Sequence, residues 1–219
     1  REGNSTVSAA ATDNGGPVIA YEHRTPAAYA LRGLSPGGQD VYVLTEGDRL
    51  KHGLSLIEDV SPCVTTLRHL TTAQLSLTPS AFKRFFTDAG LPCWLIRSDR
   101  KTLSKPLMAY VQSVETLAAR YVTNTIRGKD WYRYRVHPAP DILVASGFRA
   151  QGPKVFANQV KAIALGSVYG VFAVDTESRS SLIRSLRSFD FGSHVVAHSN
   201  GLKKIEVRQL NAVLGQLVT

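Results

Sequence analysis

The sequence predicts an α+β fold, in which amphipathic helices pack against a mixed or antiparallel sheet. Strand patterns and helix patterns are both frequent along the 219 residues. The segments between them are too irregular for the regular strand and helix alternation of a doubly wound sheet. Hydrophobic residues make up 43% of the chain, which is enough for one sizeable core and shows no disordered or fibrous bias.

The first third of the chain begins with a polar segment and continues with turns and strands. Residues 1–16 are mostly small and polar, as is typical of a connector, and "PVIAYE" (17–22) can begin an edge strand. A further strand leads into the turn "SPGGQ", and "DVYVLT" (40–45) is expected to be a strand because Val and Tyr favour a pleated surface. We therefore divide the chain into a flexible connector, residues 1–29, and one domain, residues 30–219.

Four helices are predicted from their apolar faces and end signals. In "TPSAFKRFFTDAG" (78–90), Thr78 can cap the helix, Pro79 suits its first turn and Gly90 can end it. Three more helices and three apolar strands follow from their hydrophobic periodicity. The helices are expected at 105–122, 177–189 and 206–217, and the strands at 93–98, 140–145 and 153–158.

Positive charge is concentrated in the middle of the chain. The formal net charge is +9, and residues 97–161 hold 12 basic and 4 acidic side chains, which gives +8 of that total. Such a positive field attracts polyanions through long-range electrostatics and through counterion release at phosphates. Nucleic acid is therefore favoured as the partner over an unspecialised solvated surface.

The densest part of this region is "RGKDWYRYR" (127–135), which combines four cations with three aromatic rings. If the stretch is extended, its arginines face one side and its tyrosines the other, so that one side contacts DNA while the other packs. The cations can neutralise phosphates or reach guanine, and the rings can brace them by cation–π contact. For the rings, a core role is the alternative, and it is favoured for Trp131. The predicted DNA-binding residues are Arg127, Lys129, Trp131, Tyr132, Arg133 and Arg135, followed by Arg149, Lys154, Asn158, Lys161 and Lys203.

The remaining reactive residues predict neither a metal site nor a disulfide. Cys63 and Cys93 lie 30 positions apart and are expected to be buried free thiols. The histidines show no convincing metal-ligand spacing. No stretch approaches the roughly 20 apolar residues of a membrane span, and no secretion signal is found, so a cytoplasmic location is expected. Because the chain starts at Arg1 and not at methionine, we expect it to derive from a longer polypeptide.

Four motifs in a fixed order make the chain recognisable as a whole. They are "RGLSPGGQDVYVLT", "LPCWLI", "WYRYRVHPAPDILVASGFR", and "ANQVKAIALGSVYGV" with the downstream "GLKKIEVRQL". From about residue 30 to 217 the chain resembles the C-terminal target-recognition region of N6-adenine DNA methyltransferases from bacterial restriction-modification systems. The third motif is the most specific, since a Trp-Tyr pair, a Pro-Asp pair, a strand and an arginine follow one another as in that family.

The resemblance implies that this chain recognises double-stranded DNA, while a methyl-transfer domain lies upstream or on a partner polypeptide. It also implies S-adenosylmethionine as the cofactor of the parent enzyme, with no cofactor bound by this chain. Enzymes of that family hold the extruded adenine with an Asn-Pro-Pro-aromatic motif and the methyl donor with a Gly-rich loop. The 219 residues contain neither Asn-Pro-Pro nor Gly-x-Gly, so no catalytic residue is assigned.

Two alternatives from other classes stay open. A non-specific module for single-stranded DNA or RNA would use the same mixture of aromatic and basic side chains. A magnesium-dependent nuclease fragment would use Asp141 and Lys161, but Gln159 stands where a second carboxylate is needed. A turn cap after Pro140 is the favoured role for Asp141.

Overall fold

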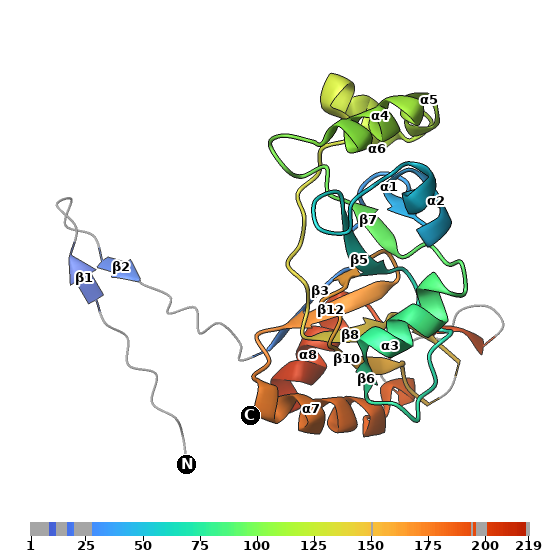
Figure 1. Ribbon diagram of the computed structural model, residues 1–219. Helices are drawn as coiled ribbons and strands as arrows, with labels where there is room; N and C mark the ends of the chain where they lie inside the picture. The colour runs from blue at the N-terminus through green and yellow to red at the C-terminus, as the bar shows by residue number, and fades with distance from the viewer. Residues whose placement is uncertain are drawn as a thin grey trace, which may run out of the picture.

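Two sheets lie one above the other in the structure, with helices packed against both (Figure 1). This arrangement confirms the α+β class and the mixed sheet that the sequence predicts. The computed structural model describes residues 9–11, 17–19, 28–149, 151–193, 195 and 201–217. Among these residues, no helix is both long and apolar enough to cross a membrane.

The larger sheet contains five strands whose order differs from their order in the chain. The order is β3 (Tyr29–Leu31), β12 (Val168–Phe172), β8 (Ile142–Ala145), β10 (Val155–Asn158) and β6 (Ser76–Leu77). Neighbouring strands are antiparallel except β10 and β6, which are parallel. The predicted strands at 140–145 and 153–158 are thus confirmed as the two adjacent strands β8 and β10.

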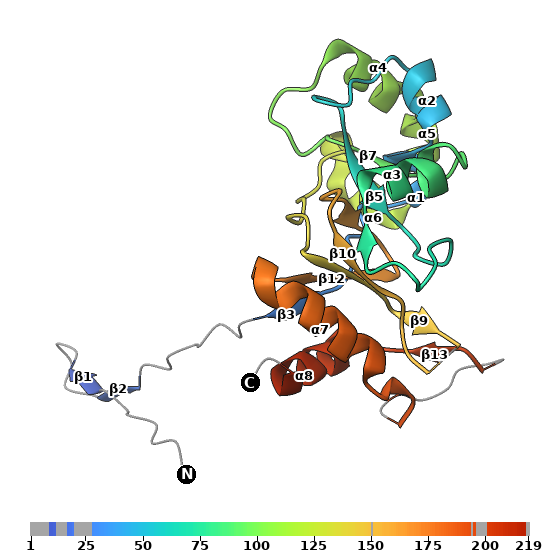
Figure 2. The same cartoon turned by 60° about the horizontal axis from the view of Figure 1, so that its bottom comes forward.

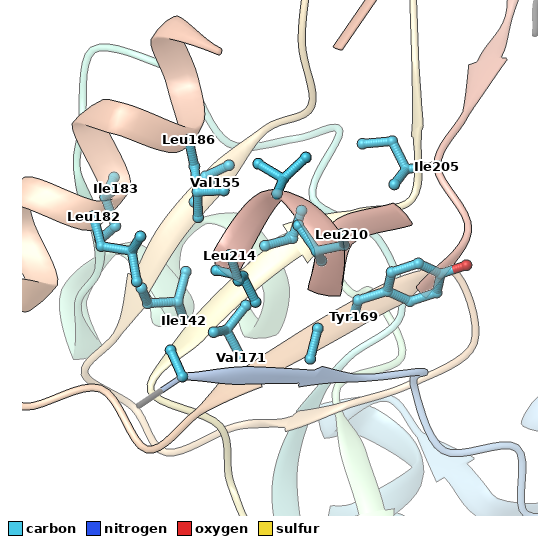
Figure 3. Close-up of a cluster of buried hydrophobic side chains, with 14 of the residues drawn as sticks. Ile142, Val155, Tyr169, Val171, Leu182, Ile183, Leu186, Ile205, Leu210 and Leu214 are labelled. Carbon is cyan, nitrogen blue, oxygen red and sulfur yellow. The ribbon is translucent and has the colours of Figure 1, made fainter. Parts of the chain in front are cut away.

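Helices α7 (Thr176–Ser188) and α8 (Val207–Leu217) pack on one face of this sheet (Figure 2). Side chains alternate along β8, so that Ile142 and Val144 point toward the helices and Leu143 toward the opposite face. Both helices confirm the sequence prediction. The apolar cluster between them and the sheet, the α7–α8 core, includes Ile142, Val155, Val171, Leu182, Ile183, Leu186, Leu210 and Leu214 (Figure 3).

A smaller, four-stranded sheet supports the other end of the molecule. Its order is β11 (Ile163–Ala164), β5 (Val60–Val64), β7 (Trp94–Ile96) and β4 (Val43–Leu44). Strand β7 lies within the predicted strand at 93–98 and pairs antiparallel with both β5 and β4. One face of this sheet carries the Tyr42 core, a buried cluster that includes Tyr42, Leu54, Val60, Leu95, Ile96, Leu107, Tyr110, Val111, Trp131 and Tyr134.

The helix predicted at 105–122 is divided into shorter helices that cover the Tyr42 core. Helix α4 (Lys105–Ser113) is followed by α5 (Glu115–Ala118), α6 (Val122–Arg127) and the 3-10 turn η2 (Gly128–Asp130). The break falls at Val114, whose ψ of 6° ends α4. The predicted apolar face still packs inward, since Leu107, Val111 and Ala118 are buried in the Tyr42 core.

The helix predicted at 78–90 forms with the expected cap. The Thr78 hydroxyl accepts a hydrogen bond from the Ala81 N–H at 3.1 Å, ahead of α3 (Pro79–Phe82). The chain then widens into the π-helical turn η1 (Lys83–Thr87). This places the rings of Phe82 and Phe86, 5.3 Å apart and nearly parallel, between the two sheets.

The prediction of a strand at 40–45 is wrong for its first half. Helix α1 (Gln39–Tyr42) precedes the two-residue strand β4. The helical turn buries both Val41 and Tyr42, whereas a strand would direct one of them away from the core. The Tyr42 hydroxyl donates a 2.7 Å hydrogen bond to the Trp131 carbonyl. A contact over this distance in the chain cannot be predicted from the sequence pattern around residue 42. Thr45 and Asp48 then form a capping box for α2 (Glu46–Lys51), which the sequence analysis did not predict.

The connector predicted at 1–29 contains a short hairpin. Strand β1 (Ala9–Ala11) pairs antiparallel with β2 (Pro17–Ile19). The expected strand at 17–22 begins as predicted, and its last three positions lie outside the described residues. The division of the chain into connector and domain stays a prediction.

The two cysteines are buried free thiols, as the sequence predicts. Their backbones are bonded to each other, with the Cys63 N–H donating to the Cys93 carbonyl at 2.8 Å. Burial raises the pKa of Cys93 to about 12 and that of Cys63 well above its ordinary value. Both groups therefore stay protonated at pH 8.

We expect a disulfide reagent at pH 8 to react with Cys63 and Cys93 only as fast as the protein unfolds. The reason is that the reactive thiolate is disfavoured and both side chains are inaccessible. Release of a chromophoric thiol, followed with and without denaturant, measures this. Fast modification of the native protein would contradict it.

Leu214→Ala should lower the free energy of unfolding by about 2–5 kcal/mol, since a fully buried leucine of the α7–α8 core leaves a cavity behind. Urea denaturation followed by circular dichroism measures the change. Arg208→Ala, at an exposed position on the same helix, is the matched control and should stay within about 0.5 kcal/mol. Equal losses in the two variants would show that α8 is not anchored as described.

Candidate nucleic-acid interface

The rings of the basic aromatic stretch belong mainly to the hydrophobic core. Trp131 and Tyr134 are buried, and both meet the Tyr42 ring edge to face at 6.1 and 5.6 Å between centroids. Tyr132 packs partly buried against the same cluster. Trp131 thus lies in the core, as favoured from the sequence, and Tyr134 lies in the same core.

Two arginines of this stretch bind backbone carbonyls. Arg127 donates to the Pro36 carbonyl and, at 3.3 Å, to the Tyr42 hydroxyl. Arg133 donates from Nη1 to the Arg100 carbonyl at 2.6 Å and from Nη2 to the Lys101 carbonyl at 3.1 Å. Both guanidinium groups thus hold loops of the same chain in place.

The backbone of the stretch does not form the extended strand that was considered for it. Residues 128–130 form η2, and no strand follows before β8. The Arg133 guanidinium lies 5.3 Å from the Tyr132 ring centroid, which is the predicted bracing contact. Lys129 and Arg135 are the exposed cations of the stretch.

A basic cleft at the other end of the molecule brings together cations from distant segments. It has a volume of about 570 Å³ and is lined by Arg68, Arg149, Lys154 and Lys204, with no carboxylate among the described residues of its wall. Leu67, Phe148, Val168 and Leu202 supply apolar wall. Because four positive side chains surround one opening, an anionic ligand is favoured there.

Two short strands position the cations on one side of the cleft. Strand β9 (Gly147–Phe148) pairs antiparallel with β13 (Lys203–Lys204), which joins parts of the chain more than 50 residues apart. Neighbouring strand residues point to opposite sides, so Lys204 lines the cleft while Lys203 lies outside it. Lys204 also pairs with Glu206 at 3.0 Å, on the exposed rim.

Lys154 has a structural role in addition to its charge. Its ammonium donates to the carbonyls of Arg68 and Leu70 at 2.7 and 2.6 Å. This contact fixes the segment that carries Arg68 at the edge of the cleft. Arg149, which was predicted with Lys154, is exposed at the end of β9.

Asn158 is the last residue of β10, and Lys161 lies in the turn between β10 and β11. The buried Asn158 amide donates to the carbonyls of Pro140 and Ala162, both at 2.9 Å, and accepts from the Ala162 N–H at 3.0 Å. Both the nitrogen and the oxygen of the Asn158 side-chain amide are therefore hydrogen-bonded within the fold. Lys161 is exposed at the tip of the turn, where its φ of 55° is the left-handed conformation.

Asp141, considered above for a nuclease, takes part in an ion pair. It accepts from Arg179 Nη2 at 2.9 Å and from the Val174 N–H at 3.2 Å, and thereby ties the start of β8 to the start of α7. In the described part of the chain, no three His, Cys, Asp or Glu side chains gather as they would around a metal ion.

Two residues of the cleft, Arg68 and Lys204, were not among the predicted DNA-binding residues. Arg68 lies outside the basic region at 97–161, in a segment with no local excess of positive charge. Lys204 directly follows the predicted Lys203 in the sequence. The pairing of β9 with β13, which no local sequence signal shows, is what brings Lys204 to the cleft.

An α+β domain with a cleft lined by cations fits the class of nucleic-acid-binding domains. The chain belongs to the family described as "Type II methyltransferase M.Eco57I, C-terminal domain", whose model matches residues 28–191. The resemblance to the C-terminal region of a restriction-modification methyltransferase is thereby confirmed. A search of curated proteins gave no match.

Arg133→Ala should lower the free energy of unfolding by about 1 kcal/mol, because two charged hydrogen bonds to a partly exposed loop are lost. Arg135→Ala, two positions further on, removes an exposed cation and should leave stability within about 0.5 kcal/mol. Urea denaturation followed by tryptophan fluorescence distinguishes the two. If both variants retained full stability, Arg133 would not hold its loop.

Proposed function

We propose that this chain is the sequence-specific double-stranded DNA recognition domain of an adenine-specific DNA methyltransferase. Methyl transfer from S-adenosylmethionine would take place in a domain outside these 219 residues, upstream or on a partner. Membership of a methyltransferase C-terminal family supports a role beside a catalytic domain. Adenine as the target base rests on the four sequence motifs alone.

The basic cleft is the observation that carries the DNA-binding part of the proposal. Its wall holds four cations and, among described residues, no acid. A DNA duplex carries one phosphate charge for about every 1.7 Å of its axis, so several phosphates can reach such a cluster at once. Release of their counterions would supply much of the affinity.

The position of the aromatic rings favours a duplex over single-stranded nucleic acid. Single-strand binders stack bases on exposed rings. Here Trp131, Tyr134 and the cleft residue Phe148 are all less than 10% exposed. Among the described residues of the cleft wall, Phe148 is the one aromatic residue and it is buried. Such a phosphate-binding surface suits a duplex, whose bases are already stacked.

Selection from a randomised duplex pool, with single-stranded DNA and RNA as competitors, tests the function. We expect enrichment of one short motif at near-physiological salt, resistant to both competitors. Binding without enrichment, or a preference for either single strand, would overturn sequence-specific duplex recognition.

The double variant Arg149→Gln/Lys204→Gln tests whether the cleft is the contact. Because each phosphate contact adds about 0.9 to the slope of log K against log salt concentration, we expect the slope to fall by about one to two. The matched control, Lys51→Gln/Lys83→Gln, removes the same charge from exposed positions on α2 and η1 and should keep the slope. Equal losses in both would refute the cleft as the binding site.

A further inference from the structure

The connection between β5 and β6, residues 65–75, passes beside the basic cleft and is anchored by two leucines. Leu67 and Leu70 are 1% and 2% exposed and pack with Phe82, Phe86 and Phe156 between the two sheets. Leu67 and the neighbouring Arg68 also line the cleft. We name this segment the clamped loop.

Arg187 of α7 and two residues that directly precede strands of the larger sheet, Lys154 and Ser167, hold carbonyls of the clamped loop. Arg187 donates from Nη1 to the Thr72 carbonyl at 2.8 Å and from Nη2 to the Gln74 carbonyl at 2.6 Å. Lys154 holds the carbonyls of Arg68 and Leu70 from the other side. Ser167 adds a fifth contact at the start, to the Thr65 carbonyl at 3.1 Å.

The two cationic residues that hold the clamped loop, Arg187 and Lys154, are themselves attached to the larger sheet. The Arg187 guanidinium also donates to the Val155 carbonyl of β10, at 3.0 Å from Nε and 2.6 Å from Nη2, and lies 5.1 Å from the Phe156 ring centroid. Lys154 directly precedes β10. A loop fixed to a rigid sheet in this way loses little conformational entropy when it binds a ligand.

The outward side of the clamped loop presents exposed polar side chains. Arg68, Thr71, Thr72 and Gln74 are exposed. Within the described part of the chain, the side chains of Thr71, Thr72 and Gln74 make no hydrogen bond, and Arg68 bonds only to the adjacent His69, at 3.1 Å. Five backbone carbonyls of the loop are therefore held, while the side chains of Thr71, Thr72 and Gln74 stay open to a partner.

We propose that the clamped loop reads base edges in the major groove, with Arg68 and Gln74 as the specificity-determining residues. Arginine is suited to the O6 and N7 atoms of guanine, and glutamine to the N6 and N7 atoms of adenine. Arg149 and Lys204 of the cleft hold the adjacent phosphates, while Lys154 and Arg187 position the loop. This inference rests on the proposed function, because it assigns the reading part of the same site.

The position of the clamped loop supports this assignment over the basic aromatic stretch. Arg127 and Arg133 in that stretch are bound to carbonyls of their own chain, whereas the side chains of the clamped loop are not. Arg68 is also part of the wall of the cleft. A loop at this edge would meet the bases next to whichever phosphates the cleft binds.

Duplex selection with Arg68→Ala, Gln74→Ala and the wild-type chain tests the proposal. Each variant should relax the preference at one or two positions of the motif and weaken binding to the selected site by about 5- to 150-fold. Gln74→Ala should keep the affinity for random duplex, since it removes no charge. The matched control is Arg120→Ala/Gln112→Ala, at exposed positions in α4 and after α5, in the helices that cover the Tyr42 core. This double variant should keep the motif.

The outcomes separate this inference from the proposed function. If the wild-type chain selects a motif and both loop variants select it with unchanged affinity, the loop does not read the bases, while sequence-specific recognition stands. If the wild-type chain selects no motif, the proposed function fails first. A preference for single strands overturns both.

Arg187→Lys tests the positioning role without a change in charge. Lysine cannot hold the carbonyls of Thr72, Gln74 and Val155 together as the guanidinium does. We expect the ratio of specific to random-duplex affinity to fall at least 5-fold, with an unchanged salt slope and a native circular dichroism spectrum. A parallel loss of both affinities would point to a general structural role and overturn the positioning role.

Discussion

Hydrogen bonds from cationic side chains to backbone carbonyls hold the long connections of this fold. Lys154 and Arg187 hold residues 65–75, while Arg127 and Arg133 hold loops near the Tyr42 core. Carbonyls that leave water need a donor, and one guanidinium supplies several in a fixed geometry. Arg127, Arg133 and Lys154, three of the 12 basic side chains in residues 97–161, are thus bonded to carbonyls of the fold. A count of basic residues therefore overstates the number of side chains free to contact a partner.

The larger sheet makes this arrangement rigid. Strand β8 is buried on both faces, with Ile142 and Val144 against α7 and α8 and Leu143 toward Phe86 and Phe156. The neighbouring strand in the sheet, β10, contains Val155, whose carbonyl accepts a hydrogen bond from Arg187. Lys154 directly precedes β10. The geometry of the cleft therefore depends on a sheet that packs on both sides, and small shifts of the loop would have to disturb that packing.

The two ends of the domain have different roles in the proposed function. The lobe around Tyr42 is held by interlocking rings and by the buried Asn124, whose amide binds Gly37 and Ala118. The cleft and the clamped loop at the other end combine a shared positive field with open side chains. Phosphate contacts give affinity and orientation, whereas base contacts give specificity, so the two groups of residues are expected to differ in what their loss changes.

Local signals in the sequence determined the elements and the family, while tertiary contacts decided the site. Thr78 and Pro79 start α3, apolar periodicity defines α7 and α8, and both act within a few residues. By contrast, the hydroxyl of Tyr42 in α1 is bound to the Trp131 carbonyl, 89 positions away, and the contact from Lys154 to Arg68 spans 86 positions. Whether an arginine is exposed or bound to a carbonyl depends on such pairings, because a side chain's surroundings are set by segments that meet only when the chain has folded.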